Sequence, residues 1–145
     1  MVGRRRPAIE QSAVATGRGD DGMTGLLFGG RIAKDDPRTE AYGSLDEAVA
    51  AFGLARAELT AAGLTDFAEA ILGYQRQLFV AGAELAVNPD ARDRLVDGVS
   101  RVSEEMLESV EVELARWESV VEMPREFVVP GETRAPAPRP GRPAG

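Results

Sequence analysis

The sequence contains no cysteine and no histidine, and each absence excludes a class of chemistry. Without cysteine the chain can form no disulfide, no thiolate nucleophile and no thiolate zinc site. Without histidine it has no imidazole to serve as a general acid, a general base or a metal ligand. Most familiar hydrolase mechanisms are therefore excluded, and any reaction at this chain must draw on other groups.

Basic residues and long apolar runs are also scarce. The 145 residues carry 17 Lys and Arg against 24 Asp and Glu, which gives a net charge of −7. A general nucleic-acid binder needs cationic surface to displace counterions, so we expect no nucleic-acid partner. The basic N-terminus lacks an apolar run of signal-peptide length, and no segment approaches 18 apolar residues. We therefore expect a single-domain cytoplasmic protein with no membrane partner.

The first predicted helix begins at Asp36 and Pro37, which suit the N-cap and the first helical position. It runs to about Ala62, because Gly63 interrupts the pattern that precedes it. Its apolar residues recur every three or four positions, as on one face of a helix: Leu45, Ala48, Phe52, Ala55 and Leu59.

Two further helices are expected. The second begins at a capping box of Asp66 and Glu69 and ends near Asn88 and Pro89. Its inward stripe is Leu64, Ala68, Ile71, Gln75, Leu78, Gly82 and Leu85. A loop over residues 88–98 leads to the third helix, which Pro124 ends. The stripe of the third helix is Val102, Met106, Val110, Leu114, Trp117 and Val121.

Three helices of similar length joined by short loops predict an all-α fold, an antiparallel helical bundle. We expect a flexible arm over residues 1–14 and a helical domain over residues 15–131 that opens with a glycine-rich loop. Residues 126–131 suit a short extended piece. The tail over residues 132–145 is rich in proline and has no large apolar residue, so we expect it to be disordered.

The glycine-rich stretch ATGRGDDGMTGLLFGGRIAKDDPR, residues 15–38, contains Lys34, the only lysine of the chain. It is not a Walker A motif, because Lys34 lies between Ala33 and Asp35, and no βαβ unit surrounds it as in a dinucleotide-binding fold. Glycine amides, the hydroxyl of Thr24 and one ammonium group could hold a polyphosphate. The residues alone leave a second interpretation open, a glycine-rich segment that binds nothing.

The stretch TGRGDDGMTGLLFGGRIAKDDPRTEAYGSLDE resembles the N-terminal signature of the PduO-type ATP:cob(I)alamin adenosyltransferases. That signature runs T-x-[TN]-G-D-x-G-x-[TS], then G-x-R-x-x-K-D, then E-A-x-G-x-x-D-E. The resemblance continues through YQRQLFVAGAELA to FVVPGE and covers residues 16–132. It departs from the family at Arg18, where Thr or Asn is usual.

The resemblance implies a reaction in which the cobalt of cob(I)alamin attacks the 5′-carbon of ATP, giving adenosylcobalamin and triphosphate. Cobalt supplies the nucleophile, so neither cysteine nor histidine is needed. Asp20 and Asp21 are expected to assist through Mg²⁺ or by holding the loop, and no metal site built from protein ligands is expected. The residues implied to line the ATP site are Thr16, Gly17, Arg18, Gly19, Asp20, Thr24 and Lys34.

Two residues outside the glycine-rich stretch have two interpretations each. Asp46 is either an ordinary helix acid or, as the resemblance implies, a residue at a subunit boundary of a homotrimer, where it pairs with an arginine of the neighbouring chain. Phe127 is either a hydrophobe that caps the bundle or the aromatic that packs beside the corrin and keeps its lower cobalt ligand away. We expect Lys34 and Asp46 to act in catalysis.

Family members continue with a fourth helix that carries R-R-A-E-R and a fifth that carries N-R-L-S-D, and neither motif is found here. We therefore expect three of the five helices of the family bundle and the first half of its active site. A tail rich in Pro, Arg, Ala and Gly suggests that the reading frame slipped near Ala135, which translation of the downstream DNA in the other frames would test. The alternative function is a catalytically inactive helical fragment or interaction module.

Overall fold

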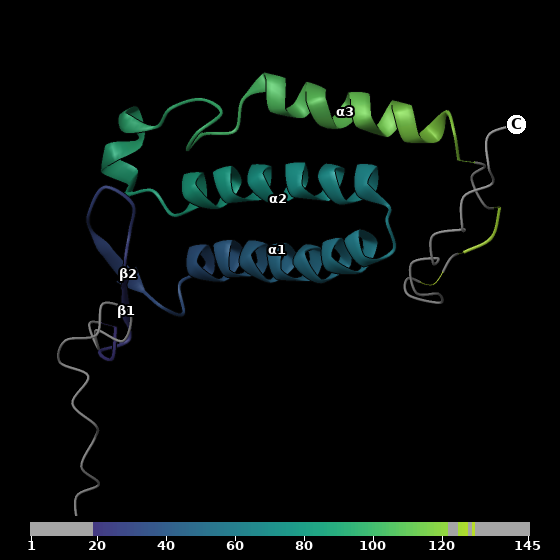
Figure 1. Ribbon diagram of the computed structural model, residues 1–145. Helices are drawn as coiled ribbons and strands as arrows, with labels where there is room; N and C mark the ends of the chain where they lie inside the picture. Colours follow the sequence, from purple (N-terminus) through teal and green to yellow (C-terminus); the bar gives the residue numbers. More distant parts are fainter. Residues whose placement is uncertain (1–18, 122–124, 128, 130–145) are drawn as a thin grey trace, which may run out of the picture.

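The computed structural model describes residues 19–121, 125–127 and 129. Helices α1 (Pro37–Ala61), α2 (Thr65–Leu85) and α3 (Glu104–Glu118) run antiparallel to their neighbours, with α2 in the middle (Figure 1). A hairpin of β1 (Met23–Gly25) and β2 (Arg31–Ala33) lies at the same end of the bundle as the short 3₁₀ helix η1 (Pro89–Arg94). The predicted helical bundle is confirmed. No helix in the described part of the chain is long and apolar enough to cross a membrane.

Helix α1 begins where the sequence predicts. Asp36 is its N-cap, with Oδ1 accepting a hydrogen bond of 2.8 Å from the backbone N–H of Arg38, and Pro37 is the first helical residue. The predicted apolar stripe is only partly correct, because Phe52 and Ala55 are exposed. The packed side instead includes Gly53, where a β-carbon would lie 3.5 Å from Nε2 of Gln75 on α2.

Helix α2 begins at Thr65, so the capping box predicted from Asp66 and Glu69 is wrong. The turn at Gly63 has a left-handed φ of 72°, and the N–H of Leu64 donates to the carbonyl of Leu59 at 2.9 Å. This turn satisfies carbonyls at the end of α1, and α2 begins directly after it without a side-chain cap. The predicted stripe is largely correct, with Ala68 and Gln75 buried, but Leu85 at its end is exposed.

Gln75 is the buried polar side chain of the described core. Its Nε2 donates to the carbonyl of Val49 at 2.9 Å, and its Oε1 accepts from Nη1 of Arg56 at 3.0 Å. Both partners belong to α1. A side chain expected from periodicity to face inward therefore cross-links the two longest helices through hydrogen bonds.

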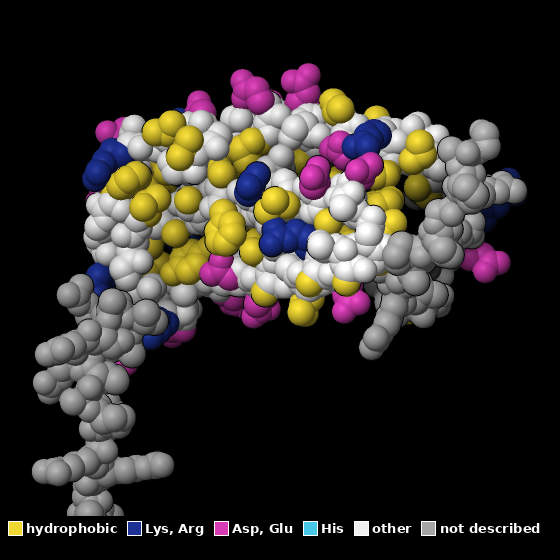
Figure 2. All heavy atoms as spheres, in the orientation of Figure 1, with side chains coloured by type: hydrophobic (Ala, Val, Ile, Leu, Met, Phe, Trp, Pro, Cys, Tyr) yellow, Lys and Arg dark blue, Asp and Glu magenta, His cyan; other side chains and the backbone are white. Residues whose placement is uncertain are grey.

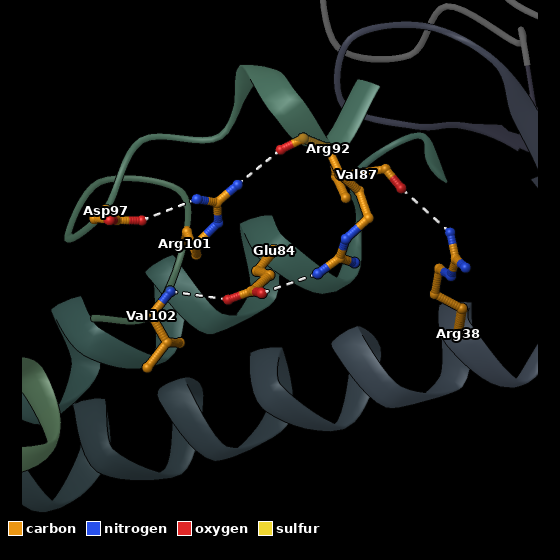
Figure 3. Close-up of polar contacts among 7 residues, drawn as sticks. All are labelled: Arg38, Glu84, Val87, Arg92, Asp97, Arg101 and Val102. Carbon is orange, nitrogen blue, oxygen red and sulfur yellow. Dashed lines mark hydrogen bonds and ion pairs between the residues drawn. The ribbon is translucent and has the colours of Figure 1, made fainter. Parts of the chain in front are cut away.

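The segment between α2 and α3 was expected to be a loop, and part of it is the 3₁₀ helix η1. Asn88 caps η1 by accepting from the N–H of Asp90 at 3.1 Å. Figure 3 shows how Glu84 holds the segment: one carboxylate oxygen pairs with Arg92 at 3.2 Å, and the other accepts from the N–H of Val102 at 2.8 Å. Arg101 adds an ion pair of 3.2 Å to Asp97.

Helix α3 is shorter than predicted and ends at Glu118, before Pro124. It has no buried residue, although the ring of Trp117 stacks on Phe67 of α2 with centroids 4.3 Å apart. Between α2 and α3 an apolar groove of about 320 Å³ remains open, with Tyr74, Leu78 and Met106 in its lining. Figure 2 shows hydrophobic side chains at the surface over the three helices.

Some predictions concern residues outside the described part of the chain. These are the flexible arm over residues 1–14, the disordered tail over residues 132–145 and half of the extended piece over residues 126–131. They remain predictions.

Candidate functional site

The glycine-rich segment was expected to be a loop, but much of it forms the β hairpin. Met23 pairs with Ala33, Thr24 with Ile32 and Gly25 with Arg31 in antiparallel register. At the tip, the N–H of Leu26 donates to the carbonyl of Gly30 at 3.1 Å. The pairing is short, and periodicity could not reveal strands of three residues each.

Three residues in succession at the tip have left-handed backbone: Phe28 with φ of 66°, Gly29 with 97° and Gly30 with 83°. Glycine adopts such angles without steric cost. At Gly30 space also matters, because a β-carbon would lie 3.2 Å from Nδ2 of Asn88. The paired glycines therefore let the hairpin turn tightly while its tip packs against Asn88, the N-cap of η1.

The hairpin is fixed to the bundle by backbone hydrogen bonds. The N–H of Leu27 donates to the carbonyl of Ala86 at 2.8 Å, and the N–H of Asn88 donates to the carbonyl of Leu27 at 3.0 Å. Between them Val87 is only 1% exposed, and its carbonyl accepts from Nη1 of Arg38 at 3.2 Å (Figure 3). The position of the hairpin is thus set by α1 and α2 together.

Beside the hairpin lies an open hollow of about 630 Å³. The structure brings three of the predicted ATP-site residues together in its lining: Gly19, Thr24 and Lys34. The rest of the lining is Met23, Gly25 and Arg31. The predicted residues Thr16, Gly17 and Arg18 precede the described part of the chain.

Lys34 supplies a positive charge at this hollow. Its N–H donates to the carbonyl of Gly22 at 2.9 Å, which fixes its backbone, while its side chain is exposed. The ammonium makes no hydrogen bond or ion pair with the described residues, and Gly19 leaves room for it, since a β-carbon there would lie 2.9 Å from Nζ. The charge is therefore available to an anion.

Arg31 of β2 forms a two-pronged ion pair with Asp21, which lies two residues before β1. The two hydrogen bonds are 2.9 and 2.8 Å long, and Oδ1 of Asp21 also accepts from the N–H of Met23 at 3.1 Å. The hydrogen bonds from Arg31 and then from Met23 hold the pKa of Asp21 below its ordinary value of 3.8. The carboxylate of Asp21 therefore holds the segment before β1 against Arg31, and the role through Mg²⁺ stays a prediction.

Sequence reasoning did not name Arg31 as a site residue, although it is the arginine of the G-x-R-x-x-K-D pattern. Its spacing from Lys34 in this pattern was the sequence signal that could have identified it. Its place at the hollow, however, depends on the hairpin register. That register places Arg31 opposite Gly25, at the tip end of the strand pairing. Asp20, a predicted site residue, is exposed and is not in the lining of the hollow.

Asp46 and Phe127 lie apart from the hollow. Asp46 is exposed on α1, about 14 Å along the helix axis from Pro37, at 1.5 Å per residue. Phe127 is 98% exposed, so the interpretation of this residue as a hydrophobe that caps the bundle is wrong. Neither residue joins Lys34 within the described part of the chain, and the roles that the family resemblance implies for them remain predictions.

The sequence pattern of the family described as cobalamin adenosyltransferase matches residues 14–138. The chain belongs to the cobalamin adenosyltransferase family. A corrinoid adenosyltransferase from Citrobacter freundii is 38% identical over 124 residues, which cover 86% of this chain and 67% of the relative. One from Bacillus subtilis (strain 168) is 33% identical over 120 residues, 82% of this chain and 58% of the relative.

Among solved structures, the fold is similar to that of a variant PduO-type ATP:corrinoid adenosyltransferase from Lactobacillus reuteri, complexed with cobalamin and ATP. The TM-score is 0.69 at 26% sequence identity, over 83% of this chain and 64% of that chain. This chain therefore spans about two thirds or less of the length of these family members.

Proposed function

We propose that the chain binds ATP in the hollow beside the hairpin and serves the transfer of the 5′-deoxyadenosyl group from ATP to cob(I)alamin. The products are adenosylcobalamin and triphosphate. The observation that carries the proposal is the convergence of Gly19, Thr24 and Lys34 on one hollow, in a chain of this family. The names of the relatives and the ligands of the Lactobacillus reuteri protein support the same reaction.

The protein needs only to orient ATP and to neutralise the charge of the leaving triphosphate. A bond forms between cobalt and the 5′-carbon, the bond from that carbon to the triphosphate oxygen breaks, and the leaving group keeps the bonding electrons. The ammonium of Lys34 meets the charge that develops on the triphosphate, and the hydroxyl of Thr24 offers a hydrogen bond. Arg31 is held by Asp21 and shapes the wall of the hollow.

Mg²⁺ enters this proposal as part of the substrate, bound to the phosphates of ATP. Within the described residues no group of three or more acidic side chains is arranged to hold a metal ion. Mg²⁺ commonly keeps several waters and takes its other ligands from substrate phosphates, which suits a site with few carboxylates.

The same proposal assigns roles to the two distant residues. Phe127 is almost fully exposed, so its ring is available to the flat apolar face of a corrin. Asp46 is exposed on α1, so its carboxylate is available to an arginine of a neighbouring chain in a homotrimer. Because ATP is a substrate, the proposal also puts the protein in the cytoplasm.

A second candidate function is an interaction module that does not catalyse the transfer. The apolar groove between α2 and α3 favours it, because such a groove can receive an amphipathic helix. The two candidates differ in their requirement for ATP and for cobalamin chemistry.

The test is a calorimetric titration of the 145-residue chain with ATP and Mg²⁺, followed by an assay with chemically reduced cobalamin. We expect saturable ATP binding, and slow formation of adenosylcobalamin that depends on both ATP and protein. Binding without transfer would support the second candidate in a form that retains the ATP site. Absence of ATP binding would contradict the proposal.

A further inference from the structure

We propose that Arg94, a residue outside the hollow, positions the hairpin that forms one wall of it. Arg94 ends η1, and its guanidinium carbon lies 4.2 Å from the centre of the Phe28 ring at the hairpin tip. Figure 1 shows the hairpin reaching η1 at one end of the bundle. Arg94 does not line the hollow, so any effect that it has on a ligand there must pass through Phe28.

The contact matters because Phe28 has an unfavourable backbone conformation. Its φ of 66° is left-handed, which is rare for a bulky side chain and persists only where the surroundings impose it. Backbone hydrogen bonds fix its neighbour Leu27, but they leave the ring free to turn away. A cation over the ring face is attracted to the π-electrons, so Arg94 favours the observed rotamer and with it the strained turn.

The turn connects the two strands whose residues line the hollow. Leu26 and Gly30 close the tip by the hydrogen bond between them, and the paired strands on either side of it carry Thr24 and Arg31. Lys34 comes immediately after β2. If the tip relaxed, the strand register and the direction of Lys34 would change, and the hollow would lose its shape. The structure thus assigns Arg94 the part of a positioning residue.

The inference rests on the proposed function only for the identity of the ligand, ATP. The experiment therefore has two readouts, MgATP affinity by calorimetry and hydrogen exchange of the Leu26 amide without ligand. The variants are Arg94→Ala, Arg94→Lys, Phe28→Leu and the double variant Arg94→Ala with Phe28→Leu. Arg76→Ala is the matched control, because Arg76 is exposed on α2 and is outside the lining of the hollow.

We expect Arg94→Ala to weaken MgATP binding by about two- to fivefold, the range of an exposed cation–π contact, and to speed exchange at Leu26. Arg94→Lys should recover part of both effects. If Arg94 acts through the Phe28 ring, Arg94→Ala should change neither readout further in the Phe28→Leu background. If Arg94→Ala only lowered the general stability of the chain, its effects would add to those of Phe28→Leu. Arg76→Ala should match the wild type.

Unchanged exchange and unchanged affinity in Arg94→Ala would overturn the inference, as would additive effects in the double variant. If the wild-type chain binds no ATP, the proposed function fails, and the exchange data alone test the positioning role of Arg94. Faster exchange at Leu26 in Arg94→Ala would then still support the positioning role, and unchanged exchange would refute it.

Discussion

Gly19 and the end of the Lys34 side chain are packed so closely that a β-carbon on Gly19 would lie 2.9 Å from Nζ and 3.1 Å from Cε. The same β-carbon would lie 3.3 Å from the carbonyl oxygen of Met23. The glycine thus gives the ammonium its place at the hollow. Residues 15 positions apart in the sequence are coupled here because the hairpin folds the chain back on itself.

Gly19→Ala is expected to weaken ATP binding with little loss of stability. The added methyl group displaces the flexible end of Lys34, which moves at low cost because it is exposed. We expect an affinity loss of up to about tenfold, as for a weakened charge-assisted hydrogen bond. Calorimetry and thermal unfolding would measure the two quantities. Gly43→Ala on α1, where a β-carbon meets nothing within 4 Å, is the control and should retain wild-type affinity.

Lys34→Ala is expected to weaken ATP binding more than Lys34→Arg does. The alanine variant loses a charge-assisted contact to phosphate worth about 1.5–3 kcal/mol, whereas arginine keeps the charge with a different geometry. The comparison is made by calorimetry at a fixed salt concentration, with Arg76→Ala to control for the loss of one positive charge. Wild-type affinity in both Lys34 variants would remove this residue from the site.

The helices could be predicted from the sequence because their signals are local. Asp36 and Pro37 mark the start of α1 within one turn, and Gln75 falls on the inward stripe of α2 by spacing alone. The start of α2 was missed because a left-handed glycine turn, rather than a side chain, links it to α1. The local glycine turn, and not the capping pattern, sets the residue at which α2 begins.

The site could be predicted in its residue types but not in its geometry. Lys34 and Thr24 were identified from the family signature, whereas the pairing of Asp21 with Arg31 depends on a hairpin register that periodicity does not encode. The docking of Leu27 against Ala86 joins segments far apart in the chain. Contacts of this kind arise only when α2 and the hairpin have both formed.

The ion pair of Asp21 predicts a pH dependence of the hairpin. The pKa of Asp21 is lowered in the folded state, so its contribution to hairpin order is present above its ordinary pKa of 3.8 and is lost as the pH falls through the lowered value. The chemical shift of the Met23 amide, which donates to this carboxylate, should report a midpoint below 3.8. Asp21→Asn should abolish that transition, and a midpoint above 3.8 in the wild type would contradict the prediction.

Substitution of Gln75 should separate its hydrogen bonds from its packing. Gln75→Met keeps a similar volume but loses the bonds to Val49 and Arg56, and we expect a loss of about 1–2 kcal/mol in the free energy of unfolding. Gln75→Ala also leaves a cavity and should cost about 1–2 kcal/mol more. Denaturant unfolding measures both. Equal stability of Gln75→Met and the wild type would show that the bonds contribute nothing net.

The exposed apolar surface of α3 predicts self-association of the chain. Leu107, Val110 and Leu114 lie on one face of α3 and are 54%, 37% and 56% exposed. The helix is held to α2 mainly through the stack of Trp117 on Phe67 and the hydrogen bond between Gln77 and Ser109. Contiguous apolar surface of this kind tends to drive association. We therefore expect the 145-residue chain to be marginally stable, polydisperse and at best weakly active in adenosyl transfer.

Two substitutions on α3 should act in opposite directions when light scattering is coupled to size-exclusion chromatography. Leu114→Gln removes exposed apolar surface without touching the aromatic stack, so the apparent mass should fall towards that of the monomer. Trp117→Ala removes the stack, so α3 should separate from α2 and association should increase. A monodisperse wild-type trimer with a cooperative thermal transition and robust adenosylcobalamin formation would contradict this prediction, because the apolar surface of α3 would then already be covered in a defined assembly.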